Sequence, residues 1–171
     1  MATCYSFKND ILTAARAYQI EPALLCALIY VESKGNQWAV RVEPGFYRRY
    51  IERMKYEDLS GYKPHRFIVS EQTEKSLRAT SFGLCQVMGE TARVLGYRGH
   101  FLTELLPDTG ANIELAAKLL SAKYRQHGSW KAALAAYNTG RGNHEATNYD
   151  EHVLDVKNQK LGLEYITSAE C

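Results

Sequence analysis

The stretch LLCALIYVESKGNQW, from Leu24 to Trp38, contains the strongest fold signal in the chain. An apolar run fills its first eight positions and is followed directly by a glutamate, Glu32. On a helix, Leu25, Leu28 and Ile29 lie at positions i, i+3 and i+4, and Glu32 at i+7 falls on the same stripe. The spacing therefore predicts a helix that carries a carboxyl group toward the protein interior.

Two interpretations of Glu32 follow from this position. Burial disfavours the charged form of a carboxyl group and raises its pKa, so that it can hold and deliver a proton near neutral pH. Such a group can serve as the general acid in the cleavage of a glycosidic bond. The alternative is that Glu32 reaches water at the helix end or pairs with a basic neighbour such as Arg41. Periodicity by itself favours the alternative.

Helical periodicity also dominates the rest of the chain, and no alternating strand is longer than a few residues. Pro22 suits the first turn of the helix that holds Glu32, and Asp108 or Thr109 is expected to cap the longest helix. The predicted helical segments are 9–19, one from 22 whose end is marked by Gly35 and Asn36, 43–54, 70–78, the later part of 81–97, 111–127, 129–137 and one that begins near 149. We expect an all-α fold and a single compact domain over residues 1–171, because no repeat or linker interrupts it.

Composition and charge exclude several classes of protein. The chain is 46% hydrophobic and 23% charged with a formal net charge of +2, which is ordinary for one globular domain and gives no support for a nucleic-acid partner. No apolar segment reaches the roughly 20 residues that span a bilayer. We therefore expect no nucleic acid and no integral membrane segment.

The four cysteines are Cys4, Cys26, Cys85 and Cys171, and they show no CxxC or Cys/His spacing. A zinc site is not expected. Cys26 and Cys85 lie in apolar stretches and are predicted to be buried free thiols. Cys4 and Cys171 lie near the two ends and would pair only under oxidising conditions.

Four segments in order carry a family resemblance: ALIYVESKGN around Glu32, FGLCQVMGETARVLGY from 82 to 97, ALAAYNTGRGN from 133 to 143, and NYDEHVLDV from 148 to 156. Together with the helix that contains Asn112, they make the chain resemble the lytic transglycosylases of the soluble type over about residues 20–156. These enzymes are relatives of goose-type lysozyme and cut bacterial peptidoglycan. Each motif is weak alone, and the order of the four is what makes the resemblance specific.

The resemblance implies a lysozyme-like helical fold with a groove for glycan strands. It assigns Glu32 as the catalytic acid, which protonates the oxygen between N-acetylmuramic acid (MurNAc) and N-acetylglucosamine (GlcNAc). The same residue then takes a proton from the muramoyl C6 hydroxyl, so that ring closure leaves a 1,6-anhydro end. The substrate's acetamido oxygen supports the developing positive charge, and neither a metal nor a cofactor is implied. We expect a monomer whose partner is peptidoglycan.

The resemblance also assigns residues to the glycan groove. Gln86 and Met88 follow a turn at Gly83, Tyr137 and Asn138 offer a stacking face and amide donors, and the late Tyr149 is expected to hydrogen-bond near Glu32. Each has a structural alternative. Gln86 and Met88 would form a core turn, Tyr137 would be an ordinary core residue, and Asn138 would end a helix.

Two further residues complete the candidate set. Ser33 follows Glu32 in the motif and is a weaker substrate-binding candidate. Glu43 would be a second carboxylate, orienting water for hydrolysis as in an inverting muramidase. Its alternative role is to cap the helix that begins after it at Pro44. A third function class is a wall-binding protein that keeps the fold without turnover.

The sequence departs from the family pattern at several places, most in the segment AVRVEPGFYRRYIERM (39–54) and the turn-rich stretch after it, which replace a shorter loop. Cys85 and Gly89 replace a methionine and a proline, and Arg41 occupies the place of a serine that is often found nine residues beyond the glutamate.

The opening residues MATCYSFKND lack the apolar core of a secretory signal. For action at the wall, in the periplasm or outside the cell, we expect release of a phage-type lysin by a holin-like partner. Other non-classical export, or excision from a longer exported protein, is the alternative.

Overall fold

The computed structural model describes residues 7–139 and 148–167. The helices are α1 (Lys8–Tyr18), α2 (Pro22–Ser33), α3 (Pro44–Phe46), α4 (Glu71–Arg78), α5 (Gly89–Val94), α6 (Thr109–His127), α7 (Trp130–Thr139), α8 (Tyr149–Asn158) and α9 (Glu164–Thr167). A π-helical turn, η1, covers Tyr47–Ile51, and short 3-10 turns are η2 (Tyr56–Asp58) and η3 (Leu102–Leu105). The predicted all-α, lysozyme-like fold is confirmed.

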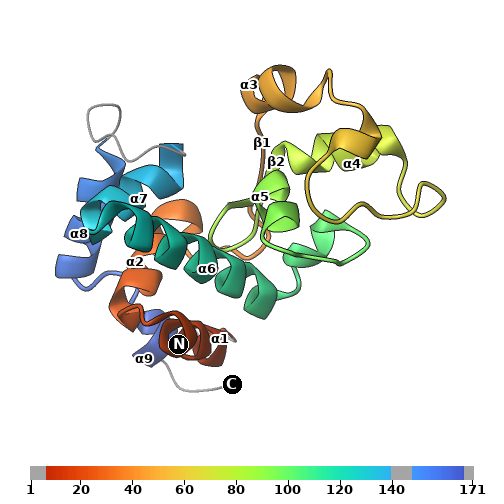
Figure 1. The fold of residues 1–171 in the computed structure, drawn as a ribbon. Helices are drawn as coiled ribbons and strands as arrows, with labels where there is room; N and C mark the ends of the chain where they lie inside the picture. Colours follow the sequence, from red (N-terminus) through yellow and green to blue (C-terminus); the bar gives the residue numbers. More distant parts are fainter. Residues whose placement is uncertain (1–6, 140–147, 168–171) are drawn as a thin grey trace.

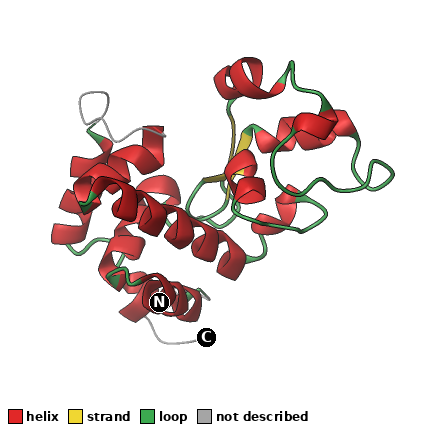
Figure 2. Ribbon diagram, viewed as in Figure 1, coloured by secondary structure: helices red, strands yellow, loops and turns green. Residues whose placement is uncertain are grey.

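The helices form two groups that meet at a small sheet (Figure 1). One group contains α1, α2, α6, α7, α8 and α9, and the other contains α3, α4 and α5. The strands are β1 (Val40–Val42), β2 (Thr80–Phe82) and β3 (Val87–Met88), paired antiparallel in the order β1-β2-β3. Figure 2 shows these strands at the junction of the two groups. The sheet therefore links the two halves of the molecule.

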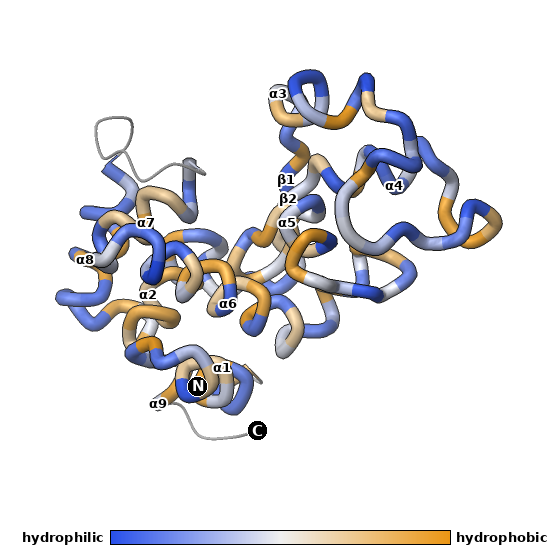
Figure 3. Tube along the Cα trace, viewed as in Figure 1, coloured by the Kyte–Doolittle hydropathy of each residue, from blue (hydrophilic) through white to orange (hydrophobic). Residues whose placement is uncertain are grey.

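Local signals explain where the long helices begin and end. Pro22 occupies the first position of α2, as its missing N–H allows. The side chain of Asp108 caps α6 by accepting a hydrogen bond from the Ala111 N–H at 2.8 Å. At the other end Gly128 adopts a left-handed conformation with φ 76°. Figure 3 shows apolar and polar residues alternating along α6, as expected for a helix with one face in the core.

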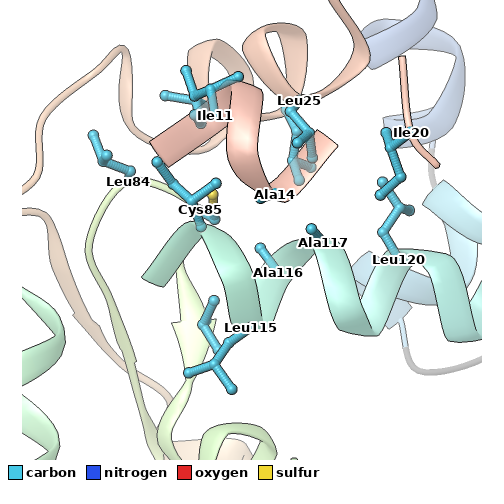
Figure 4. Packing of buried hydrophobic residues seen from close by; sticks show 14 of the residues in the cluster. Ile11, Ala14, Ile20, Leu25, Leu84, Cys85, Leu115, Ala116, Ala117 and Leu120 are labelled. Atoms are coloured by element: carbon cyan, nitrogen blue, oxygen red, sulfur yellow. The ribbon is translucent and has the colours of Figure 1, made fainter. Parts of the chain in front are cut away.

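The main core is built around α2 and α6. All six residues from Leu24 to Ile29 are buried, so α2 is covered on every side and not only along the stripe that the sequence analysis considered. In Figure 4, Ile11 from α1 and Ala116 from α6 lie close to Cys85 from the turn before β3. The predicted burial of Cys26 and Cys85 as free thiols is confirmed. Cys4 and Cys171 lie outside the described residues.

Helix α4 confirms the predicted helical segment 70–78, but three of its charged residues, Glu74, Lys75 and Arg78, are buried. Glu74 and Arg78 are fully buried, and both join Arg93 of α5 in an ion cluster. The Arg78 Nε and the Arg93 Nε donate to Glu74 Oε1 at 3.0 and 2.8 Å, and Glu90 accepts from Arg78 Nη1 at 2.7 Å. Two cations and two anions therefore balance inside this half, which the pattern of α4 alone did not reveal.

A second, smaller hydrophobic cluster supports the segment between β1 and α4. Ile51, Tyr56 and Leu59 are buried together, and Phe46 and Tyr47 pack against them. The Tyr56 hydroxyl donates to the Pro64 carbonyl at 2.6 Å. This cluster holds α3 and η1 in place beside the sheet.

Within the described ranges, no helix combines the length and apolar character needed to cross a bilayer.

Candidate active site

A groove with a volume of about 380 Å³ lies where the two halves meet. Residues from the end of α2, from the sheet and from the end of α7 line it. Side chains from both halves line it: Glu32, Arg41, Phe46, Tyr50, Ser81, Gln86, Val87, Met88, Thr91, Leu119, Tyr137, Asn138 and Thr139. Five residues that the sequence analysis selected, namely Glu32, Gln86, Met88, Tyr137 and Asn138, are thus brought to one place.

Glu32 lies in the last turn of α2 and is half-buried. Burial raises the pKa of its carboxyl group above the usual range, and two smaller effects oppose this: a hydrogen bond from Tyr149 and the positive charge of Arg41. The Tyr149 hydroxyl donates to Glu32 Oε1. The result is a carboxyl group that favours its protonated form more than an exposed glutamate does, with one oxygen held in place.

Two tyrosines support the site with their hydroxyl groups. Tyr149 is held at the start of α8, and Tyr137 Oη donates to the Cys85 carbonyl at 2.8 Å. Burial is the main cause that raises the pKa of both phenols well above the usual range. Both hydroxyl groups therefore stay protonated, so they act as hydrogen-bond donors at any ordinary pH.

The turn that brings Gln86 into the groove is held by a buried asparagine from α6. Asn112 Oδ1 accepts from the Cys85 N–H at 3.0 Å, and its Nδ2 donates to the Phe82 carbonyl at 2.8 Å. Gly83 has φ +74°, and a Cβ there would lie 2.6 Å from Asn112 Nδ2. The close approach explains why glycine stands at this position.

The position of Gln86 is compatible with both interpretations that the sequence left open, a groove residue and a residue that stabilises a turn. It lines the groove, and its Nε2 donates to the carbonyls of Ala39 at 3.1 Å and Gly83 at 3.0 Å. Its own backbone is left-handed, with φ 49°. The amide is thus fixed by the backbone on one side, while the side chain forms part of the groove wall.

Ser33 is not among the groove-lining residues that the structure describes. Its hydroxyl donates to the Leu84 carbonyl at 2.8 Å and also contacts the Ile29 carbonyl at 3.3 Å. These contacts join the end of α2 to the turn before β3. Its geometry therefore favours a positioning role next to Glu32 over direct contact with substrate.

Glu43 also lies outside the groove lining among the described residues. It occupies the N-cap position of α3, but its side chain makes no capping hydrogen bond. Instead Glu43 Oε1 accepts from Arg41 Nε at 2.5 Å. The pairing of Arg41 with Glu32, which the sequence allowed, is not the one that forms.

Sequence reasoning did not select several groove residues, including Phe46, Tyr50 and Ser81. Ser81 lies on β2, a strand too short for its alternation to stand out. Phe46 and Tyr50 belong to the segment that departs most from the family pattern, where only a helical pattern was visible. Their place in the groove depends on how this segment folds back against the sheet.

The described parts of the chain contain no group of three His, Cys, Asp or Glu side chains suited to a metal ion. The two buried thiols lie in the core, and burial raises the pKa of Cys26 to about 12. The pKa of Cys85 is raised further by the same cause. Neither thiol is therefore a thiolate at neutral pH.

A helical fold whose groove holds a partly buried glutamate places the protein in the lysozyme-like fold class. The chain belongs to the transglycosylase SLT domain family, whose model matches residues 10–160. The resemblance seen in the sequence is thereby confirmed. Membership implies transglycosylase-type activity on peptidoglycan. No match was found among curated proteins or among solved structures.

Proposed function

We propose that the protein is a peptidoglycan lytic transglycosylase that cleaves the β-1,4 bond between MurNAc and GlcNAc, with Glu32 as its catalytic residue. The observation that carries this proposal is the environment of Glu32, a carboxyl group in the groove whose pKa is raised by burial and whose oxygen accepts from Tyr149. A general acid requires this combination of a held proton and a fixed position.

In the proposed reaction Glu32 gives its proton to the glycosidic oxygen as the bond from the muramoyl C1 breaks. The acetamido oxygen of the same sugar supports the positive charge at C1. Glu32, now a carboxylate, removes the proton from the C6 hydroxyl, whose oxygen bonds to C1. Atoms balance without water, and Glu32 ends the cycle protonated, as it began.

The geometry of Glu43 supports this path over hydrolysis. Glycosidases with two carboxyl groups place them on either side of the scissile bond, about 5 to 9.5 Å apart. Glu43 is directed to Arg41 and does not line the groove within the described residues. One catalytic carboxyl group with an internal nucleophile fits this arrangement.

Mass spectrometry of digested peptidoglycan tests the proposal directly. We expect muropeptides that end in 1,6-anhydro-muramic acid. Reducing muramic acid ends would instead identify a hydrolytic muramidase, and unchanged walls bound by the protein would identify a binding protein. The Glu32→Gln variant is the matched control and should lose at least about 100-fold in lysis while it folds and binds glycan. Undiminished lysis would rule out Glu32 as the acid.

We also infer that the enzyme acts as a monomer at the cell wall. For the route to the wall we propose release of a phage-type lysin by a holin-like partner. Expression in the cytoplasm with and without a membrane-permeabilising partner tests this route, because lysis should then require the partner.

A further inference from the structure

The sheet presents one row of side chains to the groove. Arg41 on β1 pairs with Ser81 on β2, and Ser81 pairs with Met88 on β3. Residues that are paired across strands lie on the same face of a sheet. All three line the groove, so this face forms its wall and Arg41 lies on the edge strand at the end of the row.

Arg41 is held in a way that leaves part of its guanidinium available. Its side chain is 65% exposed, and its Nε donates to Glu43 Oε1 at 2.5 Å. Among the described residues, the structure gives Arg41 no other hydrogen bond or ion pair. A guanidinium has five N–H donors in a planar fork, so the two Nη groups keep the geometry that suits a carboxylate.

Arg41 also supplies the positive charge in the groove lining. Glu32 and Arg41 are the two charged side chains among the described residues that line it. In the protonated form that the proposed reaction requires, Glu32 carries no charge, and Arg41 is then the one charged side chain among the described lining residues. The ion pair with Glu43 orients the side chain, and Glu43 itself lies outside the lining.

An aromatic pair lines the same groove as Arg41. Phe46 and Tyr50 both line the groove, with ring centroids 4.9 Å apart and planes tilted by 49°. Tyr50 is half exposed, at 50%, and it lies in the π-helical turn η1. Such turns occur often at functional sites. An apolar ring face beside a cation suits a sugar that carries an anionic substituent.

We propose that Arg41 is a substrate-binding residue that recognises a carboxylate carried by the glycan strand, next to a sugar that lies against Phe46 and Tyr50. This inference rests on the proposed function, because it names the part of peptidoglycan that the groove distinguishes from a neutral glycan. Two sources supply the carboxylate. In strands without peptide stems, the carboxylate is that of the lactyl group of N-acetylmuramic acid. In intact strands the lactyl group is amidated, and the carboxylate belongs to the peptide stem.

Binding to the full chain carrying Glu32→Gln tests the proposal without turnover. Calorimetry compares this protein with the same chain carrying Arg41→Gln, Arg41→Lys or Arg48→Gln. Arg48 is exposed, lies on η1 and is not among the described lining residues, so its substitution makes the same charge change away from the groove. The ligands are chitotetraose, which is neutral, an amidase-stripped muramoyl tetrasaccharide, and the same tetrasaccharide with peptide stems.

We expect Arg41→Gln to weaken binding of one or both anionic ligands by about tenfold and to leave chitotetraose unchanged. Arg41→Lys should recover part of the loss, because it keeps the charge without the planar fork. A loss confined to the stripped ligand identifies the lactyl carboxylate, and one confined to the stem-bearing ligand identifies the stem. Arg48→Gln should bind all three as the parent does.

Equal weakening for all three ligands, or none for either anionic ligand, would overturn the proposal. A high-salt series gives a second readout, since the difference in affinity between the parent and the Arg41→Gln variant should shrink as charges are screened. Failure of this binding test leaves the product analysis intact, because the two experiments measure different steps. Failure of the anhydro-product test would refute the proposed reaction and leave the affinity comparison readable.

Discussion

The hydroxyl of Tyr149 donates a hydrogen bond to Glu32 Oε1, and the two residues are 117 positions apart in the chain. Glu32 ends the central helix α2, and Tyr149 begins α8, which packs against α2. The bond favours the carboxylate and so lowers the pKa of Glu32, against the larger raising effect of burial. This contact therefore adjusts the proton affinity of the acid and fixes its orientation.

Replacement of Tyr149 by phenylalanine should shift the pH dependence of lysis. Loss of the hydrogen bond removes an effect that lowers the pKa of Glu32, so the pKa rises and the acid stays protonated to higher pH. We expect the alkaline limb of the pH–rate profile to move upward and the maximal rate to fall by roughly tenfold. Turbidity clearance of cell walls across pH measures both.

Tyr124→Phe is the matched control for that change, because Tyr124 is exposed and stacks on Trp130 away from Glu32. The pH–rate profile of the Tyr124→Phe variant should overlay that of the parent protein. An alkaline limb that stays in place or moves to lower pH in Tyr149→Phe would contradict the role given to this hydroxyl.

Substitution Glu32→Gln should stabilise the fold at neutral pH. The pKa of Glu32 is higher in the folded protein than in the unfolded chain, so its contribution to stability is fully present below the unfolded pKa and is lost as pH rises through the folded pKa. Glutamine does not ionise, so the variant does not lose this stability as pH rises. Thermal unfolding should show a higher Tm for the variant at about pH 8 and nearly equal values at about pH 4.

A variant that is less stable than the parent at both pH values would show that burial of the Glu32 charge does not cost stability. Substitution of Glu114, which lies on α6 outside the groove lining, by glutamine serves as the control. Its effect on Tm should not show the same rise with pH.

Glu43→Gln distinguishes one catalytic carboxyl group from two. Because Glu43 pairs with Arg41 outside the groove lining, we expect the variant to keep anhydro products and at least about one tenth of the parent rate. Loss of the charge partner would leave Arg41 less well oriented, which explains the modest decrease. Chromatography of muropeptides, with product identity by mass, gives the answer. Complete inactivity would point to a second catalytic carboxylate.

The Tyr137 hydroxyl should contribute to stability through the turn before β3. It donates to the Cys85 carbonyl at 2.8 Å, and Tyr137→Phe removes that bond while the ring stays. We expect a loss of about 1 kcal/mol in the free energy of unfolding, measured by urea denaturation. Tyr124→Phe should change it by about 0.5 kcal/mol or less. Equal effects of the two would show that the Tyr137 bond contributes nothing net.

The ion cluster around Glu74 should be far more sensitive than surface pairs. Glu74→Gln leaves Arg78 and Arg93 facing a neutral amide inside the protein, and we expect a loss of about 3–5 kcal/mol in stability. Glu71→Gln breaks a partly exposed pair with Lys75 at 3.1 Å and should cost about 1 kcal/mol or less. Calorimetric unfolding compares them, and similar values would refute the proposed importance of the buried cluster.

The helices were the most predictable part of this protein. Segment 9–19 was predicted helical and α1 spans Lys8–Tyr18, while α2 begins at Pro22 as expected. Proline positions, caps and apolar spacing are local signals, and helical hydrogen bonds join residues only a few positions apart. The sheet was not predicted, because strands of two or three residues are too short to show alternation, and β1 pairs with β2 across about 40 positions.

The helix α4 itself was predicted, but the burial of its charged residues was not, for a related reason. Glu74 and Arg78 look like surface residues in the sequence, and only the approach of α5 shows that they are buried partners of Arg93. Burial of a charged side chain depends on its long-range partner, which a local pattern does not contain.

By itself, the sequence determined that a helix places Glu32 on one stripe with apolar residues and that the motifs of the chain resemble one enzyme family. The tertiary structure decided which residues surround that carboxyl group. Tyr149 reaches it from α8, whereas Arg41 pairs with Glu43. The physical reason is that a pKa and a hydrogen bond depend on distances of a few ångströms, and only the packing of distant helices and strands sets those distances.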